Sequence, residues 1–407
     1  MRHRRALAAA AVIALSGAAP AVAGQEEEAP DQGVGGALQS WSSVPIADDA
    51  TRASGSLHLW GQLQTWATVA DQDRDLQADP ATYGDPEADP GFSISRARIG
   101  FDGFLPMGDR ACCGQVDYAL SVGIGAPYDA LSTVPSGSVQ VVDAFGRWAM
   151  PWSWGVTSVA AGMQRVPFGR EAMMSSARLV FQERGVATNW MTPSREVGAV
   201  LGQSVHFGDR GPRALVRAGL YNGNRSLFGD RDPGLMAAAR AEFLWGDAYQ
   251  TWSPDLANAV GVGGALLSNQ ELAIDTSSRE VDLLARFKWV TVMGEVITSH
   301  ITLGDTTVVA PELLGETNRL GVNGQLSVYV PLPGAGGVEA AGRFSSFDDD
   351  RGRTNAGDVQ ILHTGLTWRD ALPGFDLGGG YIHRQEPAAI PNDTVRLWMQ
   401  VRPSTRL

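Results

Sequence analysis

Most of this chain consists of short segments in which apolar and polar residues alternate. In QVDYALSVGI the apolar positions are Val116, Tyr118, Leu120, Val122 and Ile124, and polar or small residues stand between them. Successive side chains of a strand point to opposite faces, so this pattern predicts a strand with one apolar face. The segments TNRLGVNGQLSVYV and DTVRLWMQVR repeat it. The pattern therefore predicts an all-β protein.

The pattern predicts sixteen strands, and most are close to the roughly 9 to 11 residues that a tilted strand needs to cross a bilayer. They are expected at residues 55–69, 92–104, 115–126, 138–150, 155–165, 195–207, 213–222, 234–246, 258–268, 279–289, 291–301, 317–330, 337–347, 358–369, 374–385 and 393–402. Long and short breaks alternate between the first strands, as they do in outer-membrane barrels. No helix or second apolar layer is predicted that would cover the apolar rows in water. We therefore predict a transmembrane antiparallel β-barrel of 16 strands over residues 55–402.

The N-terminus carries the features of a secretory signal peptide. Residues 1–23 combine a basic start, a short apolar run and a small-residue cleavage site. Residues 24–54 are rich in Gly, Pro, Ala and acid, and we expect a flexible segment there. Removing the signal takes away three arginines, so the net charge changes from -12 to -12 - 3 = -15. Such an acidic chain is a poor partner for nucleic acid.

The chain has two cysteines, which are the neighbours Cys112 and Cys113. Adjacent α-carbons lie about 3.8 Å apart, which is below the usual span of a disulfide. Two thiols in a turn, a strained vicinal disulfide and metal binding all remain open from the sequence.

Residues 162–202 interrupt the alternation between two strands, and a loop of this length is usually functional. We predict that it folds into the barrel and narrows the pore. The candidate constriction residues are Arg165, Arg170, Glu171, Arg178, Glu183 and Arg184.

Charged residues on the predicted strands must face the lumen, because an arginine facing lipid at the bilayer midplane costs about 2 to 4 kcal/mol. The candidate pore-lining residues are Arg96, Arg98, Asp102, Asp143, Arg147, Arg217, Arg240, Arg319, Arg343 and Arg396. Two roles are open for these arginines. They can pair with carboxylates and hold the wall, or they can contact a permeating anion, since a guanidinium stays ionised and binds carboxylate or phosphate with two parallel hydrogen bonds.

Several segments give the sequence a resemblance to the phosphate-selective porin O and P family. They are SRARIGFDGFL, VVDAFGRW, AGMQRVPFGRE followed by SSARLVFQER, PSREVGAVLGQ and GLYNGNRS. The resemblance implies a sixteen-stranded barrel in the bacterial outer membrane. It also implies a homotrimer, and a third extracellular loop that folds inward after residues 164–169. This chain departs from the family in having one lysine, Lys288, so phosphate selectivity does not follow from the resemblance. The end WMQVRPSTRL lacks the usual terminal aromatic residue, and we expect residues 403–407 to form a short tail.

These observations predict a porin that lets small hydrophilic solutes diffuse through the outer membrane, with anions such as phosphate as candidates. Its expected partners are outer-membrane lipid and the solute, and no cofactor or metal is expected. No nucleophile motif surrounds the histidines, so we do not expect an enzyme. The alternatives are a porin for carbohydrates and a secreted all-β binding protein without channel activity.

Overall fold

The computed structural model describes residues 55–70, 91–107, 114–125, 139–208, 211–224, 234–271, 274–303, 315–334, 336–354, 357–387 and 393–406. All of them belong to one compact unit, Gly33–Leu407. The signal peptide, the segment at residues 24–54 and the two cysteines lie outside the described residues.

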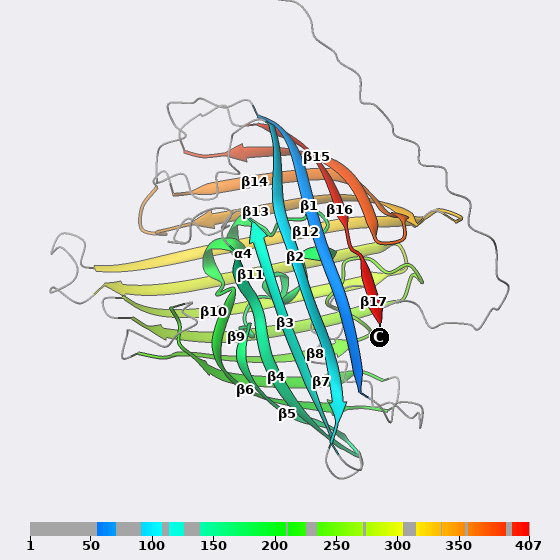
Figure 1. The fold of residues 1–407 in the computed structure, drawn as a ribbon. Coiled ribbons are helices and arrows are strands. Elements are labelled where there is room, and N and C mark those ends of the chain that lie inside the picture. Colours follow the sequence, from blue (N-terminus) through cyan, green and yellow to red (C-terminus); the bar gives the residue numbers. More distant parts are fainter. Residues whose placement is uncertain are drawn as a thin grey trace, which may run out of the picture. The chain divides into compact units, whose positions relative to one another are not determined.

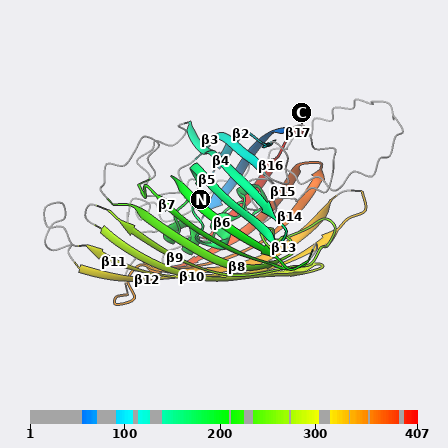
Figure 2. The same ribbon diagram turned by 90° about the horizontal axis from the view of Figure 1, so that it is seen from below.

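The described residues form one antiparallel sheet whose strands follow the chain order (Figures 1 and 2). The strands are β1 (Ser56–Ala70), β2 (Gly91–Pro106), β3 (Gln115–Gly125), β4 (Gln140–Trp152), β5 (Gly155–Arg165), β6 (Arg195–His206), β7 (Arg213–Tyr221), β8 (Met236–Trp245), β9 (Ala259–Gln270), β10 (Ile274–Phe287), β11 (Val290–Leu303), β12 (Gly315–Pro331), β13 (Gly337–Asp348), β14 (Val359–Leu372), β15 (Phe375–Gln385), β16 (Thr394–Val401) and the short β17 (Ser404–Arg406). The predicted strands are confirmed, with shifts at their ends.

The sheet closes because β1 pairs with β2 on one side and with β16 and β17 on the other. Leu63 lies opposite Val401, and His58 lies opposite Arg406 in the seam. The expected C-terminal tail therefore contains a strand that lengthens the closing pair. Closure leaves no unpaired edge in the ladder, as a barrel in lipid requires.

The largest shift concerns β10, which begins at Ile274 rather than at residue 279. The first five residues of β10, IDTSS, do not alternate between apolar and polar residues, so the sequence pattern did not predict a strand there. The backbone nevertheless pairs, with Asp275 opposite Gln270 and Thr276 opposite Ile301. The ladder extends beyond the apolar part of the strand.

The two faces of the sheet show that the polar side is the inside. In β8, Arg240 and Glu242 are buried, whereas Phe243 and Trp245 are exposed. This burial pattern is the reverse of that in a water-soluble protein. The barrel therefore has a charged interior and an apolar outer face, as transmembrane barrels do.

The connection between β5 and β6, residues 166–194, is called L3 below. It contains α3 (Arg170–Met173), the 3-10 turn η3 (Ser176–Arg178) and α4 (Val186–Met191). The helix α4 packs on β11, β12 and β13, and Figure 1 shows it between the strands. Phe168, Phe181 and Ala187 of L3 are buried. Among the described residues, no helix combines the length and the apolar character needed to cross a membrane.

Candidate functional site: the charged interior and L3

Main-chain carbonyls of L3 accept hydrogen bonds from side chains on several strands. Donor–acceptor distances are 3.1 Å for Gln64 Nε2 to Ser176 O, 2.9 Å for Gln400 Nε2 to Ala177 O, 3.1 Å for Arg369 to Leu179 O, 2.6 Å for Arg96 to Gln182 O and 2.7 Å for Arg343 to Glu183 O. The donors come from β1, β2, β13, β14 and β16, so L3 crosses the interior. These contacts satisfy carbonyls that would otherwise be buried without partners.

Arg170 anchors one end of L3 to the barrel wall. Its side chain is fully buried, forms an ion pair with Asp282 and lies 3.6 Å from a carboxylate oxygen of Glu242. A second nitrogen donates to the carbonyl of Ala248 over 3.1 Å. The guanidinium of Arg170 therefore directs its N–H groups at the barrel wall and not at the open part of the lumen. The structure therefore places this candidate constriction residue in a structural contact.

The two acidic candidates of L3 are also held by arginines of the wall. Glu171 lies 3.0 Å from Arg343, and Glu183 lies 2.6 Å from Arg396. The other carboxylate oxygen of Glu171 accepts from the main-chain nitrogen of Gly185 over 2.9 Å. These acids bind L3 to β13 and β16 and are buried there.

Gly185 of L3 packs closely against Asn323 of β12. A methyl group at this position would stand 2.1 Å from Oδ1 of Asn323. We expect Gly185→Ala to displace L3 at a cost of about 1 to 3 kcal/mol, as overpacking of a filled core does. Trypsin should then cut within L3 faster than in the parent protein. The matched control is Gly324→Ala in β12, where the added methyl meets nothing within 4 Å. Equal cleavage of both variants would contradict this prediction.

Most of the predicted pore-lining residues lie in charge pairs of the wall. Arg240 contacts three buried acids, Arg217 contacts Glu242, Arg147 lies 2.6 Å from Asp117, and Asp102 lies 3.0 Å from His58. Arg96, Arg343 and Arg396 are buried against L3, and Arg319 is half-buried on the inner row of β12. The alternative of paired wall residues therefore describes most of these positions.

Four partly exposed arginines contact L3 or lie next to another arginine of the group. This arginine cluster consists of Arg98 on β2, Arg165 at the end of β5, Arg184 on L3 and Arg195 at the start of β6. Arg165 and Arg184 both donate to the carbonyls of Ala172 and Met174, so their guanidinium groups lie side by side. Arg98 donates to Oγ of Ser176 over 3.0 Å.

The carboxylate of Asp143 bonds to the arginine cluster, since its Oδ1 accepts from Nε of Arg195 over 2.8 Å, and Glu171 and Glu295 attract Arg184 from outside the cluster. Asp143 also attracts Arg98 and Arg165, and Arg195 repels both. Burial, and next the charge of Arg96, lower the pKa of Arg184 to about 9. The four arginines and Asp143 together carry a formal charge of 4 - 1 = +3. Like charges held this close favour the entry of an anion.

Arg178, the remaining candidate of the constriction, lies apart from the arginine cluster. Burial lowers its pKa, and the charge of Asp247, which acts in the opposite direction, comes from the connection between β8 and β9. The structure thus divides the predicted constriction residues among three places: Arg165 and Arg184 lie in the cluster, Arg178 lies near Asp247, and Arg170, Glu171 and Glu183 lie in contacts with the wall.

The aromatic residues inside the barrel pack L3 against the wall. Phe181 stacks on His363 with ring centroids 3.9 Å apart, and Arg396 lies 4.0 Å from the ring centre of Trp66. Trp398 joins the same cluster, and all three large aromatic side chains are at most 4% exposed. Trp66 and Trp398 share the parity of the polar residues on their strands, whereas Phe181 lies on L3, so the alternation did not predict that the three rings would pack together.

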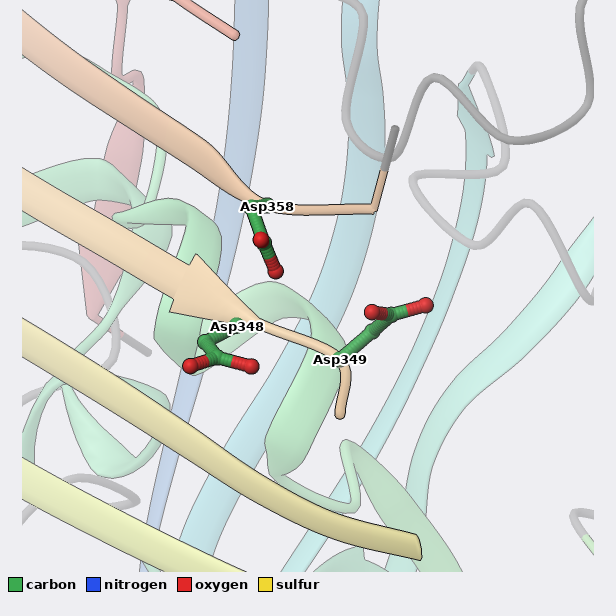
Figure 3. Close-up of side chains that lie close together, drawn as sticks. All are labelled: Asp348, Asp349 and Asp358. Carbon is green, nitrogen blue, oxygen red and sulfur yellow. The ribbon is translucent and has the colours of Figure 1, made fainter. Parts of the chain in front are cut away.

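Asp348, Asp349 and Asp358 form an acidic group between β13 and β14, which the sequence analysis did not single out (Figure 3). One carboxylate oxygen from each lies within 4.8 Å of the others. Acidic residues gathered at a strand end are common without an ion. Asp348 and Asp349 are adjacent in the sequence and Asp358 follows nine residues after Asp349, so the run of acids was the signal that the sequence offered.

The family model of phosphate-selective porin O and P matches residues 70–246. The resemblance seen in the sequence is confirmed. The matched part contains L3 and all four residues of the arginine cluster. With the closed barrel and its apolar outer face, the match places this chain in the bacterial outer membrane. No curated protein matches the sequence.

Solved porins share the fold at low sequence identity. An anion-selective porin from Comamonas acidovorans is 11% identical, with a TM-score of 0.54 over 86% of this chain and 100% of that chain. The outer membrane channel DcaP of Acinetobacter baumannii is 13% identical, with a TM-score of 0.52 over 88% and 100%. The trimer form of OmpT of Vibrio cholerae is 11% identical, with a TM-score of 0.53 over 86% and 100%. These likenesses establish the sixteen-stranded barrel.

Proposed function

We propose that this porin is a passive channel for small anions, which diffuse past the arginine cluster between L3 and the wall formed by β2, β5 and β6. The observation that carries the proposal is the charge of the cluster, where four guanidinium groups face one carboxylate. A guanidinium can form paired hydrogen bonds with carboxylate or phosphate oxygens and keeps its charge over the physiological pH range. Rings of such groups select anions in known pores.

Burial supports this choice of path. The arginines that touch β8, β10, β13, β14 and β16 have their donors directed at carboxylates or at carbonyls of L3, and they are buried. The side chains of the arginine cluster keep exposed area although they lie at the same loop. The resemblance in fold to a porin described as anion-selective agrees with this reading. Inorganic phosphate and small carboxylates are the proposed solutes.

A carbohydrate path is the less favoured candidate. Sugar rings stack on exposed aromatic faces, whereas Trp66, Phe181 and Trp398 in the described interior are buried where L3 meets the wall. We therefore expect glucose or maltose to leave the ion current unchanged.

The test is the reversal potential of the purified protein in a planar bilayer under a potassium chloride gradient. We expect a reversal potential whose sign corresponds to preferred passage of chloride. We also expect the chloride current to fall when inorganic phosphate is added. Arg184→Gln should reduce the preference, whereas the control Arg319→Gln, which removes a lumen charge outside the cluster, should change it less. A reversal potential of the cation-selective sign would contradict the proposal.

We also propose that the porin forms a homotrimer. The OmpT structure of Vibrio cholerae, described as a trimer form, supports this by its similar fold. Light scattering in detergent should give three times the chain mass after correction for bound detergent. A monomeric mass in several mild detergents would contradict the trimer.

A further inference from the structure

The connection between β8 and β9, residues 246–258, is long for its place in the barrel. Neighbouring strands are antiparallel, so connections after odd-numbered strands lie at one end and those after even-numbered strands lie at the other. L3 belongs to the first end. The 246–258 connection belongs to the second, together with the two-residue turns at 153–154, 288–289 and 373–374. Turns at this end face the periplasm in outer-membrane barrels and are short.

This connection folds inward. Ala248, Tyr249, Thr251 and Trp252 are all at most 6% exposed. Their neighbours are residues of the inner face: the ring of Trp252 lies 5.4 Å from that of Tyr329 and 5.6 Å from the guanidinium carbon of Arg369.

Strand side chains hold its main chain from inside the barrel. Arg286 donates to the carbonyls of Gln250 and Ala257, both over 2.8 Å. Thr291 donates to the carbonyl of Thr251 over 2.6 Å. These bonds fix the connection at three places, so its position does not depend on one contact.

Tyr249 provides a further anchor. Burial raises the pKa of Tyr249 to about 12, against the opposing charge of Arg217, so the hydroxyl is protonated and donates to Glu242 over 2.5 Å. The same oxygen accepts from Arg217 over 2.9 Å.

The connection meets L3 inside the barrel. Arg170 of L3 donates to the carbonyl of Ala248 and lies 5.3 Å from the ring centre of Tyr249. Met173, Met174 and Leu179 of L3 join Ala248 and Tyr249 in one apolar cluster. Two segments that enter from opposite ends therefore pack together, on the side of the interior formed by β7, β8, β10 and β11.

We infer that the 246–258 connection is a second constriction element, which closes this side of the lumen and confines solutes to the side of the arginine cluster. The inference rests on the proposed channel function and adds the segment that sets the width of the path. Tyr249 and Trp252 act as positioning residues, since they hold the segment and do not touch the solute.

Two variants test the inference by single-channel conductance and by the largest polyethylene glycol that enters the pore. In the first, an Asn-Gly turn replaces residues 248–257. In the second, which keeps the full chain, Tyr249→Ala and Trp252→Ala remove the anchors. Trp152→Ala with Trp154→Ala is the matched control, because these tryptophans are exposed at the same end of the barrel.

We expect both test variants to conduct at least about two-fold more than the parent and to admit larger polymers, since conductance follows pore width. Anion preference should persist, because the arginine cluster is intact. Parent conductance and polymer cut-off in the anchor variant would overturn the inference and leave the channel function standing. If the parent does not conduct, a current through the variants would support closure of the pore by the 246–258 connection. If the variants also carry no current, both the channel function and this inference would be overturned.

Discussion

Exchanging Arg98 and Arg195 for glutamate is expected to convert the channel from anion to cation preference. The change takes the charge within the arginine cluster from +3 to 2 - 3 = -1. Both residues lie on strands, so the ladder holds the new carboxylates at the path, and Arg165 and Arg184 keep their bonds to L3. Two unit charges 4 Å apart interact with about 4 kcal/mol at an effective dielectric constant of about 20, so a change of tenfold or more in the permeability ratio is expected.

The measurement is the reversal potential under a salt gradient, made on protein whose migration changes on boiling, which shows that the barrel has formed. The control is Arg319→Glu with Arg353→Glu. It changes the net charge of the chain equally, but it places one carboxylate on β12 and the other in an exposed loop. If both double variants shift the reversal potential alike, the general field of the lumen sets selectivity and the cluster has no special role.

Replacing Arg240 with methionine is expected to destabilise the barrel more than any other single change in the wall. Its guanidinium lies 3.2 Å from Glu242, 2.8 Å from Glu280 and 2.6 Å from Asp282, and all four side chains are fully buried. Removing one partner of a buried ion pair typically costs about 3 to 5 kcal/mol, because the remaining charges lose their compensation.

Urea titration in lipid vesicles, followed by tryptophan fluorescence, measures this cost. Adding Asp282→Asn to Arg240→Met should restore part of the lost stability, since the carboxylate that Arg240 had paired with is then replaced by a neutral amide. Arg353→Gln, which breaks an exposed pair with Asp350, should cost at most about 1 kcal/mol. A loss of stability for Arg240→Met no larger than that of Arg353→Gln would refute the account.

The strands could be predicted because their signal is local. In β8, the alternation of MAAARAEFLW assigns Arg240 and Glu242 to one face and Phe243 and Trp245 to the other, whatever the rest of the chain does. The same parity placed the arginines inside, and the break after residue 165 located L3. The parity rule missed the start of β10, where polar residues occupy both faces.

The roles of the charged residues could not be predicted in this way. Arg170 and Arg184 are both arginines of L3, yet the first is paired with the wall and the second lies in the arginine cluster. The difference depends on Asp282 and Arg165, and these contacts are known only when L3 is folded. The inward path of the 246–258 connection was missed for the same reason, since its anchors Arg286 and Thr291 follow it in the chain.

The sequence by itself therefore determined the barrel, the number of its strands, the face on which most strand charges lie and the position of L3, whereas Asp275 and Arg279 near the start of β10 lie on the outer row. Period-two alternation and the cost of burying charge in lipid act on each segment separately, so they can be read without the fold. The tertiary structure decided which arginines pair with carboxylates, which remain at the path, and how two segments from opposite ends meet. These depend on distances of a few ångströms between residues far apart in the chain, and electrostatic and packing energies are set by those distances.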